Sequence, residues 1–403
     1  MKDPNIACLI NMPRQIPFAK ILYQTCPHKL KIVVTNFSAG SEFTKILHWK
    51  KHKSFSPCLS PQDRKELKED LGDDLIICNS ISDYNKALFD CDICLSDGRE
   101  FIVLLPQAFK IKKYIALSTS YISRLLHVLP IYNGKLFITC ESEANYNDII
   151  QNYYTKTSEA EKSEILNIYK KVFPDLRDCQ SFENIDLSPF FIKSGYMSEN
   201  YNFLKKIKKD VIKKELGIPL DKKIALFSCR KSIHGSSFFS SDKEFISQNK
   251  KSLNKLKDLG YYIICRQRTG GHDKNHYQQT IASPLLNGDI IDQTINGFSG
   301  FPSLIYKLCY ISDFIFLADL SAIGSIEGLI CKTPSFVPYL KDTYNKSNFR
   351  VYGQIWRDMI DNDVLFNDLC EKKILKAKNN IDKVREKWYD SSISNFWKNV
   401  LSY

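Results

Sequence analysis

Short runs of apolar residues recur along the first part of the chain, separated by polar or helix-like stretches. The runs cover residues 5–10, 31–35, 75–78, 92–95, 101–105 and 136–140. Each has the length of a buried strand, and residues 16–23, after the first run, have apolar residues at helical spacing. Alternating strands and helices predict a doubly wound parallel sheet, in which binding sites lie at the carboxyl ends of the strands.

The second half repeats this pattern, with apolar runs at residues 223–228, 261–265, 313–318 and 335–339. Between the last two runs, an apolar stripe with helical spacing predicts a helix that ends at Thr333-Pro334. The turn before this helix brings the hydroxyls of Ser321 and Ser325, with free backbone N–H groups, to a helix N-terminus, where anions bind well. The alternative is an ordinary strand–helix–strand crossover without a ligand.

Length and composition narrow the class of protein. A chain of 403 residues is long enough for two or three domains, and its net charge of +12 favours anionic partners. The 13 cysteines are scattered, and the close pair Cys91-x-x-Cys94 has no second pair at zinc spacing. We therefore expect a reducing cytosol and no metal site. Without a signal peptide or an apolar run of ~20 residues, the chain is predicted to be cytoplasmic, soluble or peripheral to a membrane.

One aspartate in the first half is a candidate for acid–base chemistry. Asp97 follows the run 92–95, so we expect it at the carboxyl edge of the sheet, where it could act as general base toward an acceptor hydroxyl. The alternative is an ordinary turn at Asp97-Gly98. Asp90-x-Asp92 fits the metal-binding D-x-D of nucleotide-sugar enzymes, although so short a pattern recurs by chance.

A basic stretch in the first half is interleaved with aromatic residues. It contains Lys110, Lys112, Lys113, Arg124 and His127. Such a stretch could face an anionic acceptor or a membrane surface, and the alternative is a solvated face. His127 is also a second candidate for the general base.

The second half carries two further basic groups after its strands. Arg230 and Lys231 lie in the loop after the run 223–228, where they could neutralise a leaving phosphate, or else form part of a surface loop. Arg266, Arg268 and His272 follow the next strand beside a Gly-Gly turn. Guanidinium groups bind phosphate through two hydrogen bonds, so this second group predicts a phosphate or pyrophosphate site.

Two segments carry a family resemblance. Residues 327–334, EGLICKTP, resemble the E-x-L-x-x-G-x-P stretch in the nucleotide-binding half of GT-B glycosyltransferases, with Lys332 at the position of the usual Gly. Residues 191–227 contain F-x-x-x-G-Y, a lysine-rich stretch and ELGIPxDKKIALF, and resemble the interdomain crossing of bacterial GT-B enzymes that assemble surface polymers. Met197 departs from the Pro of those families, and their His-Gly motif has no counterpart near residues 106–108.

The families that the chain resembles by this pattern are CDP-glycerol glycerophosphotransferases of teichoic acid assembly and capsule or lipopolysaccharide transferases that use CMP-activated Kdo or sialic acid. The resemblance implies an α/β GT-B fold, with two Rossmann-like, doubly wound domains facing each other across a cleft. We expect an acceptor-binding domain at residues 1–200, a basic linker helix at 201–215 and a nucleotide-donor domain at 216–375. A C-terminal helix at 376–403 would cross back toward the first domain.

The resemblance also implies a function. The enzyme would transfer a sugar, or a sugar-alcohol phosphate, from a nucleotide-activated donor, cytidine-linked as in CMP-Kdo or CDP-glycerol, to a surface-polysaccharide, lipopolysaccharide or lipid-linked acceptor. Ser321, Ser325 and the arginines would stabilise the leaving phosphate, and Glu327 would bond hydroxyls of the donor. Asp97 or His127 would take the acceptor proton. We expect no metal and no cofactor, because cationic side chains would replace a divalent ion, and a peripheral contact with anionic membrane.

Two other functions remain open from the sequence. A sugar-nucleotide epimerase on the same architecture would turn over the donor without any acceptor. A nucleic-acid-binding protein would use the basic surface, but most aromatic residues lie in apolar runs rather than in a stripe with Lys and Arg, which favours no nucleic-acid partner.

Overall fold

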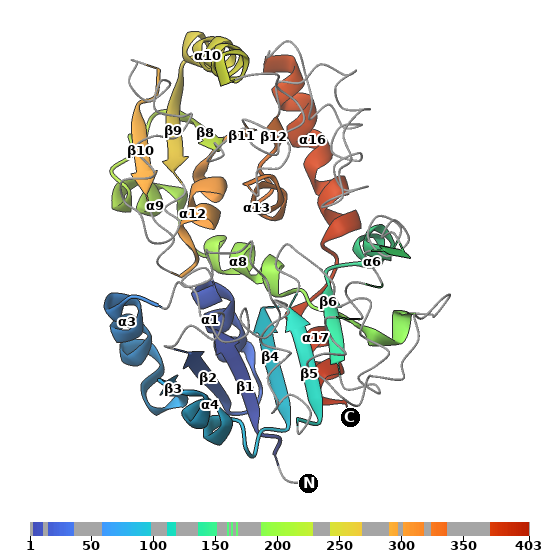
Figure 1. Ribbon diagram of the computed structural model, residues 1–403. Coiled ribbons are helices and arrows are strands. Elements are labelled where there is room, and N and C mark those ends of the chain that lie inside the picture. Colours follow the sequence, from blue (N-terminus) through green and yellow to red (C-terminus); the bar gives the residue numbers. More distant parts are fainter. Residues whose placement is uncertain are drawn as a thin grey trace. The chain divides into compact units, whose positions relative to one another are not determined.

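The computed structural model describes residues 3–10, 15–35, 59–97, 111–117, 136–150, 159–160, 163, 167, 187–228, 242–267, 290–296, 301–317, 324–336 and 371–402 (Figure 1). The chain divides into two compact units. The first consists of Met1–Tyr196 together with Ser391–Tyr403, and the second of Met197–Asp390. The chain therefore passes from one unit to the other twice, once after Tyr196 and once after Asp390.

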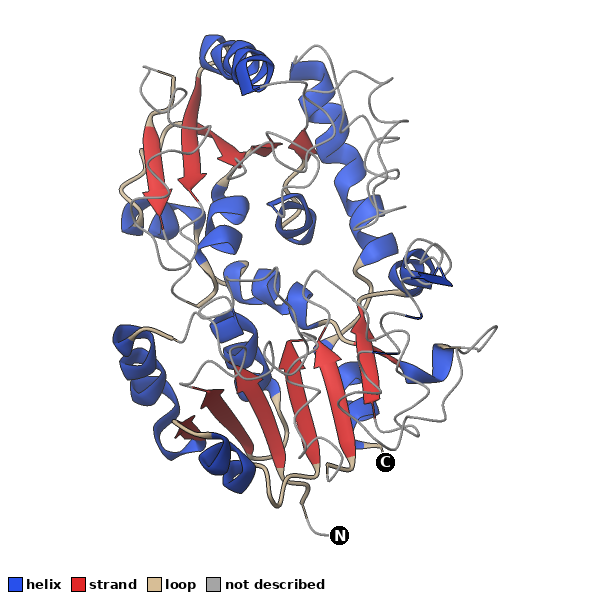
Figure 2. Ribbon diagram, in the orientation of Figure 1, coloured by secondary structure: helices blue, strands red, loops and turns tan. Residues whose placement is uncertain are grey.

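The first unit is built on a seven-stranded sheet in the order β3-β2-β1-β4-β5-β6-β7, and all of its strand pairs are parallel (Figure 2). The strands are β1 Ile6–Ile10, β2 Leu30–Thr35, β3 Leu75–Cys78, β4 Ile93–Asp97, β5 Lys113–Leu117, β6 Leu136–Cys140 and β7 Phe191–Lys193. The helices are α1 Ile16–Thr25, α3 Pro61–Leu71, α4 Ile81–Ala87, α6 Glu143–Ile149 and α17 Ile393–Leu401, with 3-10 turns at Gly72–Asp74 and Ser188–Phe190. The strand order reverses between β1 and β4, as in a doubly wound fold.

The second unit has a five-stranded parallel sheet in the order β10-β9-β8-β11-β12. Its strands are β8 Lys223–Ser228, β9 Tyr261–Gln267, β10 Gln293–Asn296, β11 Phe314–Leu317 and β12 Ser335–Phe336. Its helices are α8 Tyr196–Leu204, α9 Lys209–Glu215, α10 Asp242–Asp258, α12 Leu304–Ile311, α13 Gly324–Ile330 and α16 Glu371–Trp388. Here the order reverses between β8 and β11, so the predicted doubly wound α/β class is confirmed in both halves.

The two faces of the second sheet pack against different helices. One face is an aromatic core of Phe227, Phe314, Phe316 and Phe336, which packs with side chains of α10 and α16. Successive strand residues point to opposite faces, so residues that alternate with these lie toward α12 and α13. Gly328 of α13 is in direct contact range of Ile315 and Ser335, which confirms this placement.

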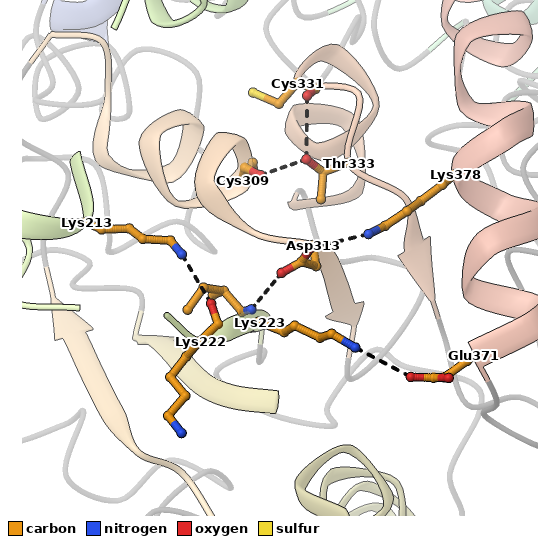
Figure 3. A network of polar contacts seen from close by, with 10 residues as sticks. Lys213, Lys222, Lys223, Cys309, Asp313, Cys331, Thr333, Glu371 and Lys378 are labelled. Carbon is orange, nitrogen blue, oxygen red and sulfur yellow. Dashed lines mark hydrogen bonds and ion pairs between the residues drawn. The ribbon is translucent and has the colours of Figure 1, made fainter. Parts of the chain in front are cut away.

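Three strands begin with the same arrangement at the amino edge of their sheet. In each case an aspartate directly precedes the strand. Its carboxylate accepts a hydrogen bond from a backbone N–H in the neighbouring strand, or in the residue just before that strand, and also pairs with a lysine (Figure 3 shows the case of Asp313). The pairs are Asp92 with Asn5 and Lys112, Asp292 with Ile263 and Lys257, and Asp313 with Ile224 and Lys378. Asp92 therefore has a structural role, and the carboxylate of Asp90 accepts from the side chain of Asn5. Both carboxylates of the D-x-D pattern therefore contact other residues of the first unit.

The structure corrects several predicted elements. The linker helix expected at 201–215 is two helices, α8 and α9, because the chain turns at residues 205–208. The C-terminal helix expected at 376–403 is also two, α16 and α17. Ser392 accepts the N–H of Asn395 and so begins α17 as an N-cap.

Some strands were not predicted. β5 begins at Lys113, a residue of the predicted basic stretch, yet all five residues of this strand are buried. β7 has three residues and β10 is polar, so neither shows an apolar run. The run predicted at 101–105 lies outside the described residues.

Candidate functional site

Helix α13 lies at the centre of the candidate site. It follows β11, so its N-terminus is on the carboxyl side of the second sheet, beside the β8–β11 reversal where doubly wound folds bind ligands. Gly328 lets the helix approach the sheet closely, because a Cβ there would lie 2.4 Å from Ile315 Cδ1 and 2.9 Å from Ser335 Oγ. The helix ends in a Schellman motif, with Thr333 N bonded to Gly328 O and Lys332 N bonded to Leu329 O.

Glu327 is a buried carboxylate in the first turn of α13, with 8% of its surface exposed. Arg266 is the last residue but one of β9, in register with Ser228 at the carboxyl end of β8. Cys265 belongs to the aromatic core, so Arg266 faces the opposite side of the sheet, the side covered by α12 and α13. The structure therefore brings a carboxylate and a guanidinium from two distant segments to the same face and the same edge.

The electrostatics of a neighbouring thiol support this placement. Burial raises the pKa of Cys309, on α12, well above its usual value. The charges of Cys331 and Glu327 raise the pKa of this thiol further, and the charge of Arg266 lowers it. Glu327 and Arg266 thus act on one sulfur atom of α12 with opposite sign. A partly buried cation and a buried anion at this edge can bind the phosphate and the hydroxyls of one ligand.

The remaining predicted donor residues fall at the limits of the described structure. Ser325 is the second residue of α13, and only its backbone is described. Arg230, Lys231, Arg268, His272 and Ser321 lie outside the described residues. Arg230 follows the last residue of β8 by two positions and Arg268 follows the last residue of β9 by one.

In the first unit, Asp97 is the last residue of β4, so its backbone lies at the carboxyl edge, at the strand where the order reverses. The position was predicted correctly; the catalytic role of Asp97 stays a prediction. His127 lies outside the described residues.

The basic stretch in the first half is placed differently from the prediction. Lys113 is buried, and its Nζ donates to the carbonyls of Asn399 (2.9 Å) and Val400 (3.0 Å) at the end of α17. Burial lowers the pKa of Lys113 to about 8. Lys112 pairs with Asp92 at 2.7 Å. Both lysines therefore contact other residues of the first unit at the amino edge of its sheet, while Lys110, Arg124 and His127 lie outside the described residues.

Cysteine and metal chemistry add little to this site. Burial raises the pKa of Cys91 to about 12 and that of Cys94 well above its usual value, so this pair behaves as buried apolar side chains. Within the described part of the chain, no three His, Cys, Asp or Glu side chains gather as a metal site would require. The helices that the structure describes include none with the length and apolar character needed to cross a membrane.

Sequence reasoning missed three residues around α13: Arg385, Asp382 and Tyr201. Arg385 Nε donates to Ile330 O at 3.1 Å, and its guanidinium lies 5.3 Å from the ring centroid of Tyr201. Asp382 forms a 2.7 Å ion pair with Lys332. The sequence pointed to this region only through Lys332, which stands where the E-x-L-x-x-G-x-P stretch usually has Gly.

Comparison with solved structures gives the fold a precedent. A variant of the wall teichoic acid polymerase TagF has 13% identity and a TM-score of 0.52, covering 98% of this chain and 87% of its own. Another TagF structure, soaked with CDPG for 15 minutes, has 14% identity and a TM-score of 0.52, covering 99% and 88%. UDP-GlcNAc 2-epimerase from Neisseria meningitidis has 12% identity and a TM-score of 0.44, covering 99% and 98%. No family model and no curated protein matches the chain.

The likeness to TagF defines the class of fold. Two Rossmann-like parallel units in a single chain, matched over nearly its whole length, constitute the GT-B fold that the sequence predicted. At these identities the likeness concerns the fold alone.

Proposed function

We propose that this protein is a GT-B transferase that moves a sugar, or a sugar-alcohol phosphate, from a nucleotide-activated donor to a surface-polysaccharide acceptor. The observation that carries the proposal is the meeting of Arg266 and Glu327 on one face of the second sheet, at its carboxyl edge. This is the edge at which doubly wound folds bind their ligands. TagF, which shares the fold, is a wall teichoic acid polymerase.

Each charged group has a distinct task in this mechanism. Arg266 would bind the donor phosphate and stabilise the charge that develops on it as the bond to the transferred group breaks. Glu327 would accept hydrogen bonds from hydroxyls of the donor ribose or sugar. Arg230, Lys231, Arg268 and His272 would complete the cationic surround, and Ser321 and Ser325 would bond phosphate oxygens with the N-terminal N–H groups of α13.

The first unit would supply the acceptor and the base. Asp97 at the carboxyl edge of β4, or His127, would remove the proton from the acceptor hydroxyl as it attacks the donor. No metal or cofactor takes part in this scheme, because the cations of the second unit neutralise the leaving group.

The donor is proposed to be cytidine-linked, such as CMP-Kdo or CDP-glycerol. The residues that resemble cytidine-using transferases and the TagF structure soaked with CDPG support this choice. A net charge of +12 suits a phosphorylated or lipid-linked acceptor and an anionic membrane surface, consistent with a protein on the cytoplasmic side of the membrane.

A thermal-shift series tests the donor class. A ligand at about 100 times its Kd adds about 2.7 kcal/mol to the free energy of unfolding, which shifts the midpoint by several degrees. We expect CMP or CDP to raise the melting temperature, and UDP and GDP to raise it less. A chain that responds to none of the four nucleotides would refute the proposal. Consumption of donor without any acceptor would instead indicate the epimerase.

A further inference from the structure

The C-terminal end of α13 is tied to α16 by charged side chains. Lys332, two residues beyond the helix, has a φ of 60°, a left-handed conformation that favours Gly. Its Nζ reaches Asp382 of α16 at 2.7 Å. The position where GT-B relatives are expected to have Gly is thus held here by an ion pair to another helix.

Arg385 makes a second tie at the same place. Its Nε donates to the carbonyl of Ile330, the last residue of α13, at 3.1 Å. Such a carbonyl has no partner inside its own helix, and the negative end of the helix dipole favours a cation there. The same guanidinium lies over the ring of Tyr201 of α8, at 5.3 Å from the ring centroid. One side chain therefore joins α8, α13 and α16.

This junction is close to Glu327. Glu327 precedes Cys331 by four residues, about one helical turn. Burial raises the pKa of the Cys331 thiol far above its usual value, Glu327 raises it further, and Arg385 and Lys209 lower it. The charges of Glu327 and Arg385 thus act on the same thiol with opposite sign, and Glu327 lies three residues before Ile330, to which Arg385 is bonded.

We propose that Arg385 is a positioning residue for the donor site: by holding the end of α13 against α8 and α16, it fixes the carboxylate of Glu327 beside Arg266. This inference rests on the proposed function. In this proposal α8 and α16 support donor binding indirectly, through Tyr201 and Arg385, and not by contact with the donor. These are the helices in which the chain enters and leaves the second unit, whose bounds are Met197–Asp390.

A double-mutant cycle separates positioning from mere stabilisation. The variants are Arg385→Met, Glu327→Gln and their combination, and the readout is the Kd of the best nucleotide from CMP, CDP, UDP and GDP, measured well below each melting temperature. We expect each single variant to weaken binding about tenfold, and Arg385→Met to have no further effect once Glu327 is Gln. Arg385→Lys keeps a cation for the Ile330 carbonyl and should restore most of the affinity.

The Tyr201 variants give a second route if Arg385→Met does not fold. Tyr201→Phe keeps the ring under the guanidinium and should bind like the unmodified chain, whereas Tyr201→Leu removes the ring and should weaken binding. The positioning role would be overturned by additive losses from Arg385→Met and Glu327→Gln, or by an unchanged Kd in Arg385→Met and Tyr201→Leu. In either case, nucleotide binding by the unmodified chain would leave the proposed function intact. A chain that binds no nucleotide would overturn both.

Discussion

Lys332 shows how a single residue can depart from a family pattern without loss of structure. Among the described residues other than glycine, it alone has a positive φ, and it occupies the C′ position of a Schellman motif, where Gly is favoured. A left-handed conformation costs a non-glycine residue roughly 1–2 kcal/mol. The ion pair with Asp382 offsets part of this cost, since exposed pairs contribute about 0–1 kcal/mol.

Lys332→Gly should therefore leave stability unchanged or raise it by up to about 1 kcal/mol, because the relief of backbone strain outweighs the lost ion pair. Lys332→Val, which is β-branched, should lower stability by more than about 1 kcal/mol. Urea unfolding followed by circular dichroism measures both. A Gly variant that is less stable than the unmodified chain by about 2 kcal/mol would contradict the assigned backbone strain.

Gly328 is the complementary case, a glycine required by packing. A Cβ at this position would meet Ile315 Cδ1 at 2.4 Å, so Gly328→Ala should destabilise the second unit by about 1–3 kcal/mol through overpacking. Ile315→Val removes the atom that is struck, and the double variant should recover part of the loss. Equal unfolding midpoints for the unmodified chain and Gly328→Ala would show that α13 does not approach β11 as described.

At the scale of elements, the C-terminal helix α17 belongs to the first unit although it is the last element of the chain. The carbonyls at its end accept two hydrogen bonds from Lys113 of β5, and Trp397 Nε1 donates to Thr25 Oγ1 of α1. At its start, a Cβ on Gly195 would lie 2.5 Å from the backbone of Ser392. The segment that leaves the first unit and the segment that returns to it therefore touch.

Lys113→Ala should destabilise the first unit by about 2–4 kcal/mol, because two carbonyls lose their donor and a buried aliphatic stem is removed. Lys112→Ala is the matched control, since its pair with Asp92 is largely exposed on the lysine side and should be worth less than about 1 kcal/mol. Limited proteolysis should release the C-terminal segment from Lys113→Ala first. Similar unfolding curves for the two variants would refute the assigned contact.

Elements with an apolar run were predicted well, and those defined by long-range contacts were not. The bounds of β3, β6 and β8 match their apolar runs, and all five residues of β6 are buried, as expected of a strand inside a parallel sheet. β5 was missed because Lys113 reads as a surface residue until α17 is folded against it. Arg266 and Glu327 were identified from their own segments. Arg385 was not, because its partners lie 55 and 184 positions away in the sequence.

At the scale of the whole molecule, each unit repeats one plan. In each, the strand order reverses beside the first strand of the sheet, and an aspartate precedes the strand on the other side of the reversal. None of the described cysteines is in a disulfide, and all except Cys26 are buried. The pKa is raised for seven of these thiols, chiefly by burial: Cys26, Cys78, Cys91, Cys94, Cys265, Cys309 and Cys331.

These thiols make stability fall at alkaline pH. Unfolded thiols lose their protons near pH 8.5, whereas the folded ones keep them, so the stabilisation is present below pH 8.5 and is lost as pH rises toward the folded pKa values. Lys113 and Lys209, whose pKa values burial lowers, act in the opposite direction but are fewer. From pH 7.5 to 9.5 under reducing conditions, the free energy of unfolding should drop by at least about 1.4 kcal/mol. A constant or rising urea midpoint would contradict the burial of these cysteines.

The most direct test of the donor site is a calorimetric titration of CMP and CDP into the unmodified chain and three variants. Arg266→Ala and Glu327→Gln change the proposed site, and Lys251→Ala removes an exposed cation on α10, which covers the opposite face of the sheet. We predict measurable binding to the unmodified chain and to Lys251→Ala, and affinity at least about tenfold weaker for the two site variants while they remain folded. Equal affinities in all four proteins would contradict a nucleotide site formed by Arg266 and Glu327.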